Sequence, residues 1–370
     1  MVHLTPGDPA PWFTASASNN PKFSFNTVGG RYIVLCFFGS AVTASSQRIL
    51  GDITRNRERF DDQQACFFGV SIDVDDQRLG RVQQQLPGIR FFWDFDQQIS
   101  RLYGALPADA TDDSQGSYRP FTIVLDPALR TLAVLSFDPP ETHVPRLLEL
   151  MDSLPPIGPV VLAALQAPVL VIPRVFEPEF CRELVGLYER HGGEESGFMR
   201  EEDGKTVLVV DYAHKRRRDY NISDERVCQA AMFRIHRRLV PEIKKVFQFN
   251  ATRMERYIVA CYEAETGGHF QPHRDNTTQG TAHRRFAVTI NLNAEEYEGG
   301  DLRFPEYGPH TYRASTGGAV VFSCSLLHEA TPITKGTRFV FLPFLYDDEA
   351  AEIRKQNNPH LADSVPRYDG

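Results

Sequence analysis

The stretch of sequence that decides the fold of the second half of the chain is Gly267-Gly268-His269-Phe270-Gln271-Pro272-His273-Arg274-Asp275. Its paired glycines mark a turn, and the residues that follow them are strand-like. Because a β-strand sends residues i and i+2 to the same face, His273 and Asp275 reach the same side while Arg274 points away. We therefore predict a strand that presents two metal ligands together.

A third ligand must come from a distant strand. His328 is the candidate, because it follows the apolar run 319–322, and Arg338 comes ten residues later. Two imidazoles and one carboxylate on one face of an octahedron are the ligand set of non-haem Fe(II), whereas zinc hydrolases more often use a tetrahedral site. The planar fork of an arginine suits a carboxylate. The four residues predict an iron site with an anchor for a dicarboxylate co-substrate.

The composition indicates a globular protein with two domains. The chain has 370 residues, which exceeds the length of one typical domain. Of these residues, 42% are hydrophobic and 24% are charged. The net charge of −8 argues against nucleic acid as a partner. No secretory signal or membrane-spanning stretch is visible, so we expect a cytoplasmic protein without a membrane partner. The six cysteines form no CxxC pair and are expected to be free, buried thiols.

The first half of the chain alternates strand-like and helix-like segments. The main ones are the strand-like runs 32–38, 65–72, 121–125 and 131–137 and the helix-like runs 45–60, 77–86 and 144–154. Such alternation is typical of an α/β sheet covered by helices. Closely spaced Pro and Gly at 154–159 interrupt the pattern. We therefore place a first domain at 1–155 and a linker at 156–167.

The second half begins with helices and changes to β-structure. Helical patterns cover 178–191 and 224–247, the latter broken near Pro241. From Glu255 onward, short β-type runs are separated by Gly, Pro and Asn turns, as in a β-sandwich or jelly roll. We place this domain at 168–350. The remaining residues, 351–370, are expected to be a polar, loosely packed tail.

Several motifs of the second domain resemble the prolyl 4-hydroxylase-like branch of the 2-oxoglutarate and Fe(II)-dependent dioxygenases. They follow the family's order over roughly 168–346 and comprise Tyr257 to Tyr262, Gly267 to Asp275, Glu298 to Pro305, Gly317 to Phe322, His328 and Arg338. A single HxD motif would be weak, but the whole set is specific. The resemblance implies a double-stranded β-helix, or jelly roll, with flanking helices.

The resemblance also implies a reaction. His273, Asp275 and His328 are then the catalytic ligands of Fe(II), Arg338 pairs with the distal carboxylate of 2-oxoglutarate, and Tyr262 helps to hold that carboxylate. O2 is the second co-substrate, and ascorbate is a candidate additional cofactor. The implied reaction converts 2-oxoglutarate to succinate and CO2 while a substrate C–H bond is hydroxylated. Because related halogenases have a small residue where Asp275 stands, hydroxylation is favoured over halogenation.

The substrate is the open part of this hypothesis. Prolyl residues of peptides are the family's best-known targets, and small molecules are the alternative. The basic run Lys215-Arg216-Arg217-Arg218 lies where relatives often place a mobile loop that covers the substrate. We favour a solvated loop face for this run. Contact with an anionic substrate is the alternative.

The first domain resembles peroxiredoxins and alkyl-hydroperoxide-reductase-type redoxins, the AhpC/TSA family. The resemblance rests on Gly7 to Phe13, the strand 32–38, Thr43 and Arg119 to Phe121. It implies a thioredoxin-like fold over roughly 7–154. The family's peroxidatic cysteine stands three residues after the threonine, and Ser46 occupies that position here.

A serine cannot replace that cysteine. Peroxide reduction depends on a low-pKa thiolate, and a serine hydroxyl is not appreciably ionised near neutral pH. Cys36 and Cys66 lie in apolar strand runs, where a thiol is buried and inert. We therefore expect no peroxidase activity. The domain is either a retained scaffold or homodimerisation element, or its former active-site pocket docks a partner or substrate.

Three classes of function follow from these patterns. The first is an Fe(II)- and 2-oxoglutarate-dependent oxygenase that hydroxylates a peptidyl, for example prolyl, or small-molecule substrate. The second is a thiol peroxidase or redox protein, which requires a reactive cysteine near Thr43. The third is a non-enzymatic protein that senses or binds oxygen or 2-oxoglutarate. We favour the first, because the iron ligands are present and the peroxidatic cysteine is not.

Overall fold

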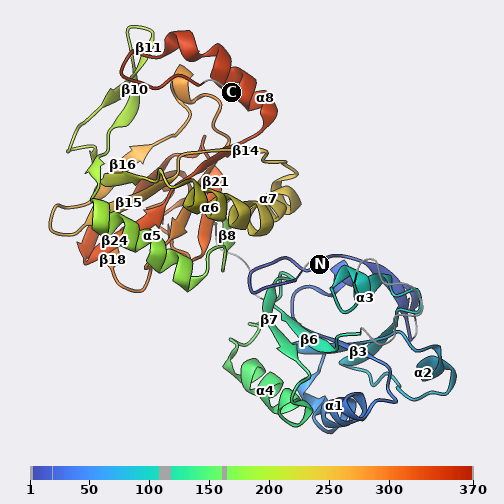
Figure 1. Ribbon diagram of the computed structural model, residues 1–370. Helices are drawn as coiled ribbons and strands as arrows, with labels where there is room; N and C mark the ends of the chain where they lie inside the picture. The colour runs from blue at the N-terminus through green and yellow to red at the C-terminus, as the bar shows by residue number, and fades with distance from the viewer. Residues whose placement is uncertain (1–2, 19, 108–117, 161–164, 369–370) are drawn as a thin grey trace. The chain divides into compact units, whose positions relative to one another are not determined.

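The computed structural model describes residues 3–18, 20–107, 118–160 and 165–368. The chain forms two compact units, Met1–Val161 and Leu162–Gly370 (Figure 1). The division falls inside the segment that the sequence predicts as a linker. Within the described residues, none of the helices is both long enough and apolar enough to cross a membrane.

The N-terminal unit is built on one mixed sheet with the strand order β2-β1-β5-β4-β3-β6-β7. Strands β3, β4 and β5 are parallel; antiparallel strands extend the sheet on both sides, β6 and β7 beyond β3 and β1 and β2 beyond β5. The strands are β1 (Thr14–Ala17), β2 (Asn20–Ser24), β3 (Tyr32–Gly39), β4 (Ala65–Ser71), β5 (Ile89–Trp93), β6 (Phe121–Leu125) and β7 (Thr131–Ser136).

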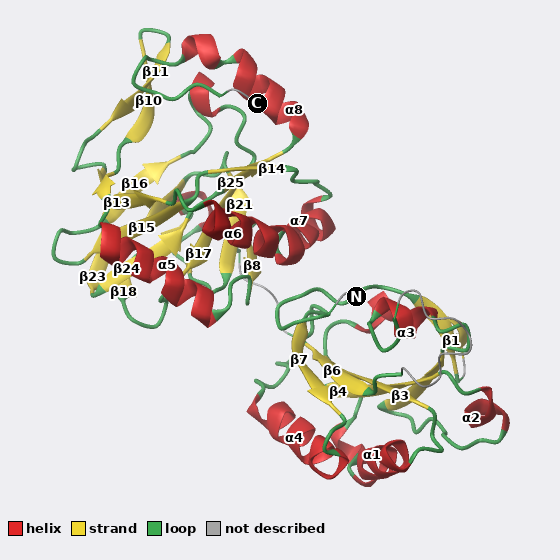
Figure 2. Cartoon of the chain, viewed as in Figure 1, coloured by secondary structure: helices red, strands yellow, loops and turns green. Residues whose placement is uncertain are grey.

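Helices cover both faces of this sheet. They are α1 (Ala44–Arg55), α2 (Val74–Arg78), α3 (Gln98–Leu102) and α4 (Pro140–Ser153), with 3-10 turns η1 (Phe25–Val28) and η2 (Arg57–Arg59). Figure 2 shows α1 and α4 on one face and α3 on the other. Strand β3 alternates accordingly: Val34 and Cys36 pack in the core that includes α1 and α4, and Ile33 and Leu35 pack in the opposite core. The thioredoxin-like α/β fold is as predicted.

The C-terminal unit contains two larger antiparallel sheets. The nine-stranded sheet has the path β14-β25-β17-β24-β15-β13-β9, with β21 and β8 added beside β17, and the five-stranded sheet has the order β12-β16-β22-β19-β20. Two small ribbons, β10-β11 and β18-β23, accompany them. The strands are β8 (Leu170–Ile172), β9 (Glu194–Glu195), β10 (Phe198–Glu202), β11 (Lys205–Val209), β12 (Lys215–Arg216), β13 (Arg218–Asn221), β14 (Arg253–Glu255), β15 (Ile258–Glu263), β16 (His269–His273), β17 (Phe286–Asn291), β18 (Glu298–Gly299), β19 (Leu302–Arg303), β20 (Thr311–Tyr312), β21 (Ala319–Ser323), β22 (His328–Ala330), β23 (Ile333–Lys335), β24 (Thr337–Phe341) and β25 (Phe344–Tyr346).

Helices pack on one face of the nine-stranded sheet and leave its other face to the interior. These helices are α5 (Pro178–His191), α6 (Glu225–Arg238) and α7 (Val240–Phe247). Helix α8 (Asp348–Gln356) and the 3-10 turns η4 (Gln279–Thr281), η5 (Pro305–Tyr307) and η6 (Asn358–His360) lie elsewhere in the unit. Strand β15 alternates between the two environments: Val259 and Cys261 pack with the helices, and Ile258 and Tyr262 pack with Phe270 of the smaller sheet. This arrangement is the predicted jelly roll with flanking helices.

The C-terminal segment 351–368 is ordered against the domain, so the prediction of a loosely packed tail is wrong. The segment begins inside helix α8, which runs from Asp348 to Gln356, and its later residues Leu361 and Val365 are buried. The backbone N–H of Ala362 donates to the carbonyl of Thr206 over 3.0 Å, and Lys205 donates to the carbonyl of Pro359. The tail therefore packs along hairpin β10–β11.

Candidate metal and co-substrate site

Three predicted ligands meet at the end of strand β16. His273 is the last residue of β16, Asp275 follows it outside the strand, and His328 begins β22. The two histidines lie opposite each other in the pairing of β16 with β22. The Nε2 atoms of His273 and His328 lie 3.6 and 3.3 Å from the two carboxylate oxygens of Asp275. One potential ligand atom from each residue lies within 4.8 Å of the others.

Hydrogen bonds orient both imidazoles for metal binding. The Nδ1 atoms of His273 and His328 lie 2.7 and 3.0 Å from the carbonyls of Gln271 and Leu326, so each Nδ1–H donates to a carbonyl. In the neutral rings, the lone pair of Nε2 then faces the carboxylate of Asp275. Burial, followed by the neighbouring His328, lowers the pKa of His273 to about 4. Three acceptors that face one another fit a bound cation.

Packing holds this cluster in place. The ring of Phe270 stacks on His273 with centroids 3.5 Å apart, and Phe322 lies 4.5 Å from the ring of His328. The N–H of Asp275 donates to the carbonyl of Cys324 over 3.0 Å. Arg274 points away from the cluster and pairs with Glu306, as the strand alternation predicts. These contacts leave the ligand atoms directed into the domain interior.

The predicted co-substrate anchors also face each other. Tyr262 of β15 lies opposite Arg338 of β24, and the guanidinium carbon lies 5.0 Å from the tyrosine ring centroid. Both side chains are buried, and the Nε of Arg338 has no hydrogen-bond partner among the described residues. A Cβ on Gly300 would overlap Ile333 Cδ1 and would approach Arg338 Cδ to 3.1 Å, so the glycine makes room for both side chains. A buried arginine without a carboxylate partner fits an anionic ligand.

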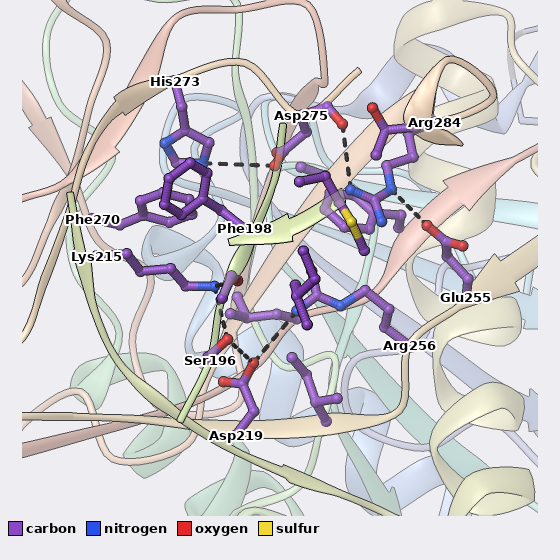
Figure 3. Close-up of a pocket in the computed structure, with 18 of the residues that line it drawn as sticks. Ser196, Phe198, Lys215, Asp219, Glu255, Arg256, Phe270, His273, Asp275 and Arg284 are labelled. Atoms are coloured by element: carbon purple, nitrogen blue, oxygen red, sulfur yellow. Dashed lines mark hydrogen bonds and ion pairs between the residues drawn. The ribbon is translucent and has the colours of Figure 1, made fainter. Parts of the chain in front are cut away.

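The site opens into a cavity of about 870 Å³. The three metal-ligand candidates, Tyr262 and Arg338 line it, together with residues of hairpin β10–β11 and of the tail. Figure 3 shows His273 and Asp275 on one side and Lys215, Ser196 and Asp219 on another. The five residues predicted from the sequence thus share one cavity.

The basic run 215–218 does not form a solvated face throughout, contrary to the favoured prediction. Lys215 and Arg217 are only 4% and 5% exposed and line the cavity, whereas Arg216 and Arg218 are exposed. The cause is strand alternation, since β12 and β13 send successive side chains to opposite sides. The sequence signal for the burial of Lys215 and Arg217 was their spacing of two residues, and Asp219 follows Arg217 at the same spacing.

In the N-terminal unit, Ser46 lies in the first turn of α1 and is buried. Its hydroxyl donates to the carbonyl of Phe38 and accepts from Thr43 over 2.7 Å. Burial raises the pKa of Cys36 and of Cys66 to about 12, so neither thiol is a ready nucleophile. Arg119, part of the resemblance, is exposed.

Family models match both units. Residues 257–346 match the 2OG-Fe(II) oxygenase superfamily, and residues 6–131 match the AhpC/TSA family. The first range contains all five predicted site residues. The chain thus combines a region of the 2OG-Fe(II) oxygenase superfamily with a region of the AhpC/TSA family, as the two resemblances imply.

Individual relatives cover parts of the chain. A PKHD-type hydroxylase of Acaryochloris marina is 36% identical over 78 residues, which are 20% of this chain and 36% of that protein. The chain spans about a third of the length of such curated relatives. A solved Pseudomonas putida prolyl-4-hydroxylase is 17% identical and covers 48% of this chain and 92% of its own, with a TM-score of 0.38. The structure of the Xanthomonas campestris bacterioferritin comigratory protein is 16% identical in sequence, and the match covers 38% of this chain and 90% of that protein, with a TM-score of 0.32.

Proposed function

We propose that the C-terminal unit is an Fe(II)- and 2-oxoglutarate-dependent hydroxylase. The observation that carries the proposal is the convergence of His273, Asp275 and His328 in the cavity that Arg338 also lines; the buried Nε of Arg338 has no hydrogen-bond partner in the described part of the chain. A closed zinc site would not need the arginine, and a structural metal would not need the cavity. The family match and the hydroxylase relatives support the same class of reaction.

Each residue then has a separate task. His273, Asp275 and His328 would hold Fe(II), which when bound supplies the oxidation chemistry that uses O2 and 2-oxoglutarate. Arg338 would pair with the distal carboxylate of 2-oxoglutarate, and Tyr262 would pack beside it. The surrounding apolar rings Phe270 and Phe322 exclude water from the imidazoles. The products are succinate, CO2 and a hydroxylated peptidyl, for example prolyl, or small-molecule substrate.

The first test is substrate-stimulated release of succinate from 2-oxoglutarate by the full chain with Fe(II), ascorbate and O2. Cell-extract metabolites and peptides serve as substrates, and mass spectrometry identifies products heavier by one oxygen atom. His273→Ala should abolish the release, because one of three metal ligands is lost. Retention of full activity in His273→Ala, or the absence of 2-oxoglutarate binding to metal-loaded protein, would contradict the proposal.

The N-terminal unit is proposed to be a scaffold or homodimerisation element without peroxide chemistry. The buried, hydrogen-bonded Ser46 and the raised thiol pKa values support the absence of peroxide chemistry. Peroxide consumption by the purified protein with a thiol reductant would contradict the absence of peroxidase chemistry. Sedimentation of the full chain tests the dimer.

A further inference from the structure

The segment that links the two sheets carries charged side chains into the cavity. Strand β12 pairs with β16 of the smaller sheet, and β13 pairs with β15 of the larger one. Lys215, Arg217 and Asp219 follow one another at every second residue and all line the cavity, which Arg256 also lines. Figure 3 shows Lys215 and Asp219 directed toward Ser196, with Arg256 on the other side of this group.

The hydrogen bonds of this cluster leave its cations incompletely paired. Lys215 Nζ donates to two neutral oxygens, Ser196 Oγ at 2.7 Å and the carbonyl of Gly197 at 2.5 Å. Arg217 donates to Asp219 over 2.7 Å, and its buried Nε has no hydrogen-bond partner among the described residues.

The cluster therefore has an excess of positive charge. Arg256 lies 3.7 Å from the same oxygen of Asp219 that Arg217 already uses. Burial would raise the pKa of Asp219, but Arg217, Lys215 and Arg256 outweigh it and lower that pKa to about 2, so the carboxylate is ionised. The guanidinium groups of Arg217 and Arg256 thus share the one carboxylate of Asp219. Burial, followed by the neighbouring Arg217, lowers the pKa of Lys215 well below its usual value, so its ammonium form lacks a compensating anion. Burying unmatched charge is costly, and an anionic ligand would relieve the cost.

The cluster is close to the proposed iron ligands and separate from Arg338. Lys215 Nζ lies 4.9 Å from the ring centroid of Phe270, and that ring stacks directly on His273. Arg338 lies over the ring of Tyr262, and Arg217 contacts the tyrosine hydroxyl at 3.4 Å. An anion at Lys215 would therefore be separated from the proposed ligand His273 by the ring of Phe270, with the 2-oxoglutarate anchor on the other side of Tyr262.

We infer that Lys215 and Arg256, supported by Arg217, form a substrate subsite for an anionic group, a carboxylate or a phosphate. This inference rests on the proposed hydroxylase function and names a class of substrate for it. The anionic group would fix the substrate so that a neighbouring C–H bond faces the metal. A neutral substrate of the same shape would leave the buried cations unmatched and would bind more weakly.

The test measures binding to the full chain loaded with Mn(II) and 2-oxoglutarate without oxygen, so that no turnover occurs. The probes are N-acetyl amino acids beside their amides, and N-acetylphosphoserine amide beside N-acetylserine amide. We expect at least one anion to raise the melting temperature while its neutral partner does not. The pair that responds distinguishes a carboxylate from a phosphate. Equal shifts within every pair, or no shift with any anion, would overturn the subsite.

Variants assign the effect to the cluster. Lys215→Met and Arg256→Met should weaken the preferred anion by about tenfold or more in calorimetry, because each removes a charged hydrogen-bond donor. Arg218→Met is the matched control, because Arg218, in the following strand β13, is exposed; this variant should bind the anion like the wild type. Lys215→Arg, which keeps the charge, should restore part of the preference.

The affinity for 2-oxoglutarate separates the two proposals. It should be unchanged in Lys215→Met, because Arg338 is the proposed anchor for that co-substrate. Weaker 2-oxoglutarate binding in Lys215→Met, with no loss of probe affinity, would assign Lys215 to the co-substrate and overturn the substrate subsite. A wild-type protein that binds no 2-oxoglutarate would instead contradict the proposed function itself.

Discussion

Arg338 lies directly opposite Tyr262 across the antiparallel strands β24 and β15, with its guanidinium carbon 5.0 Å from the ring centroid. The ring covers a cation that makes no ion pair with the described carboxylates, and a cation over an aromatic face is stabilised without losing its charge. The guanidinium is therefore held ready for a carboxylate that enters the cavity.

Arg338→Met should weaken the binding of 2-oxoglutarate to Mn(II)-loaded protein. The loss of a charge-assisted, bidentate pair is expected to cost about 2 kcal/mol, or roughly 30-fold in affinity. Isothermal calorimetry measures the change. Lys335→Met is the control, because Lys335 is exposed and pairs with Glu298. Unchanged affinity in Arg338→Met would show that another cation, such as Arg217, anchors the co-substrate.

Asp275→Asn should stabilise the metal-free protein while it weakens metal binding. Without metal, the carboxylate of Asp275 faces two Nε2 acceptors at 3.3 and 3.6 Å. A carboxamide can donate to one of them, which should add about 1 kcal/mol to the free energy of unfolding. It is a poorer ligand than a carboxylate, so Mn(II) affinity, measured by electron paramagnetic resonance, should fall by at least about tenfold.

Metal-free Asp275→Ala provides the comparison for this variant. Alanine removes the carboxylate but supplies no donor, so it should stabilise the apo protein less than asparagine does. If asparagine destabilised the apo protein, at least one imidazole would be doubly protonated, with Nδ1–H donating to its backbone carbonyl and Nε2–H donating to Asp275.

Ser46→Ala should leave succinate formation unchanged and slightly destabilise the N-terminal unit. The serine hydroxyl donates to Phe38 and accepts from Thr43, and the loss of this buried pairing should cost about 1 kcal/mol. Thermal unfolding and the succinate assay measure the two effects in the same preparation. A fall in succinate formation without a change in stability would assign the redoxin-like pocket a part in the reaction.

The closeness of two of the candidate metal ligands was predictable because their spacing is a property of the strand itself. Residues two apart share a side, so His273 and Asp275 converge even though β16 ends at His273. His328 belongs to another strand, β22, and its pairing opposite His273 leaves no local signal in the sequence. The order of the family motifs supplied what the spacing could not.

The burial of Lys215 and Arg217 was not predicted, because strand alternation does not say which side of a strand is buried. Lys215 and Arg217 share one side and Arg216 and Arg218 the other, and all four residues are basic. The choice depends on long-range contacts, with Phe270 and Asp219 lying on the buried side. The packing of the tail against the domain was not predicted for a similar reason, since Leu361 contacts its partners only in the folded domain.

Glu177→Gln should make the C-terminal unit less stable at neutral pH. Burial would raise the pKa of Glu177, but hydrogen bonds from Arg238 and Arg234 outweigh it and lower that pKa to about 2. The ionised carboxylate therefore joins α6 to the start of α5, and because it is partly exposed we expect an effect of only about 1 kcal/mol.

The pH dependence of this difference follows from the sign of the shift. A carboxyl whose folded pKa lies below its unfolded value contributes its full stability above the unfolded value, 4.5. The contribution is lost as the pH falls from 4.5 toward about 2. Urea unfolding of both proteins at pH 7 and pH 3 should therefore show a smaller difference at pH 3. A constant difference would contradict the assignment of the ion pairs.

Leu361→Asp should release hairpin β10–β11 from the wall of the cavity. Leu361 is buried and bridges to Thr206 of β11, and its Cδ2 occupies the space in front of Gly280. Burying a carboxylate there is costly, so the tail should detach while the jelly roll stays folded. Amides of 205–209 should then exchange with deuterium faster, those of β15 should not change, and Leu361→Met should behave like the wild type. Because the hairpin lines the same cavity as Lys215, anion probes should also bind Leu361→Asp more weakly than the wild type, while 2-oxoglutarate, held by Arg338, should not.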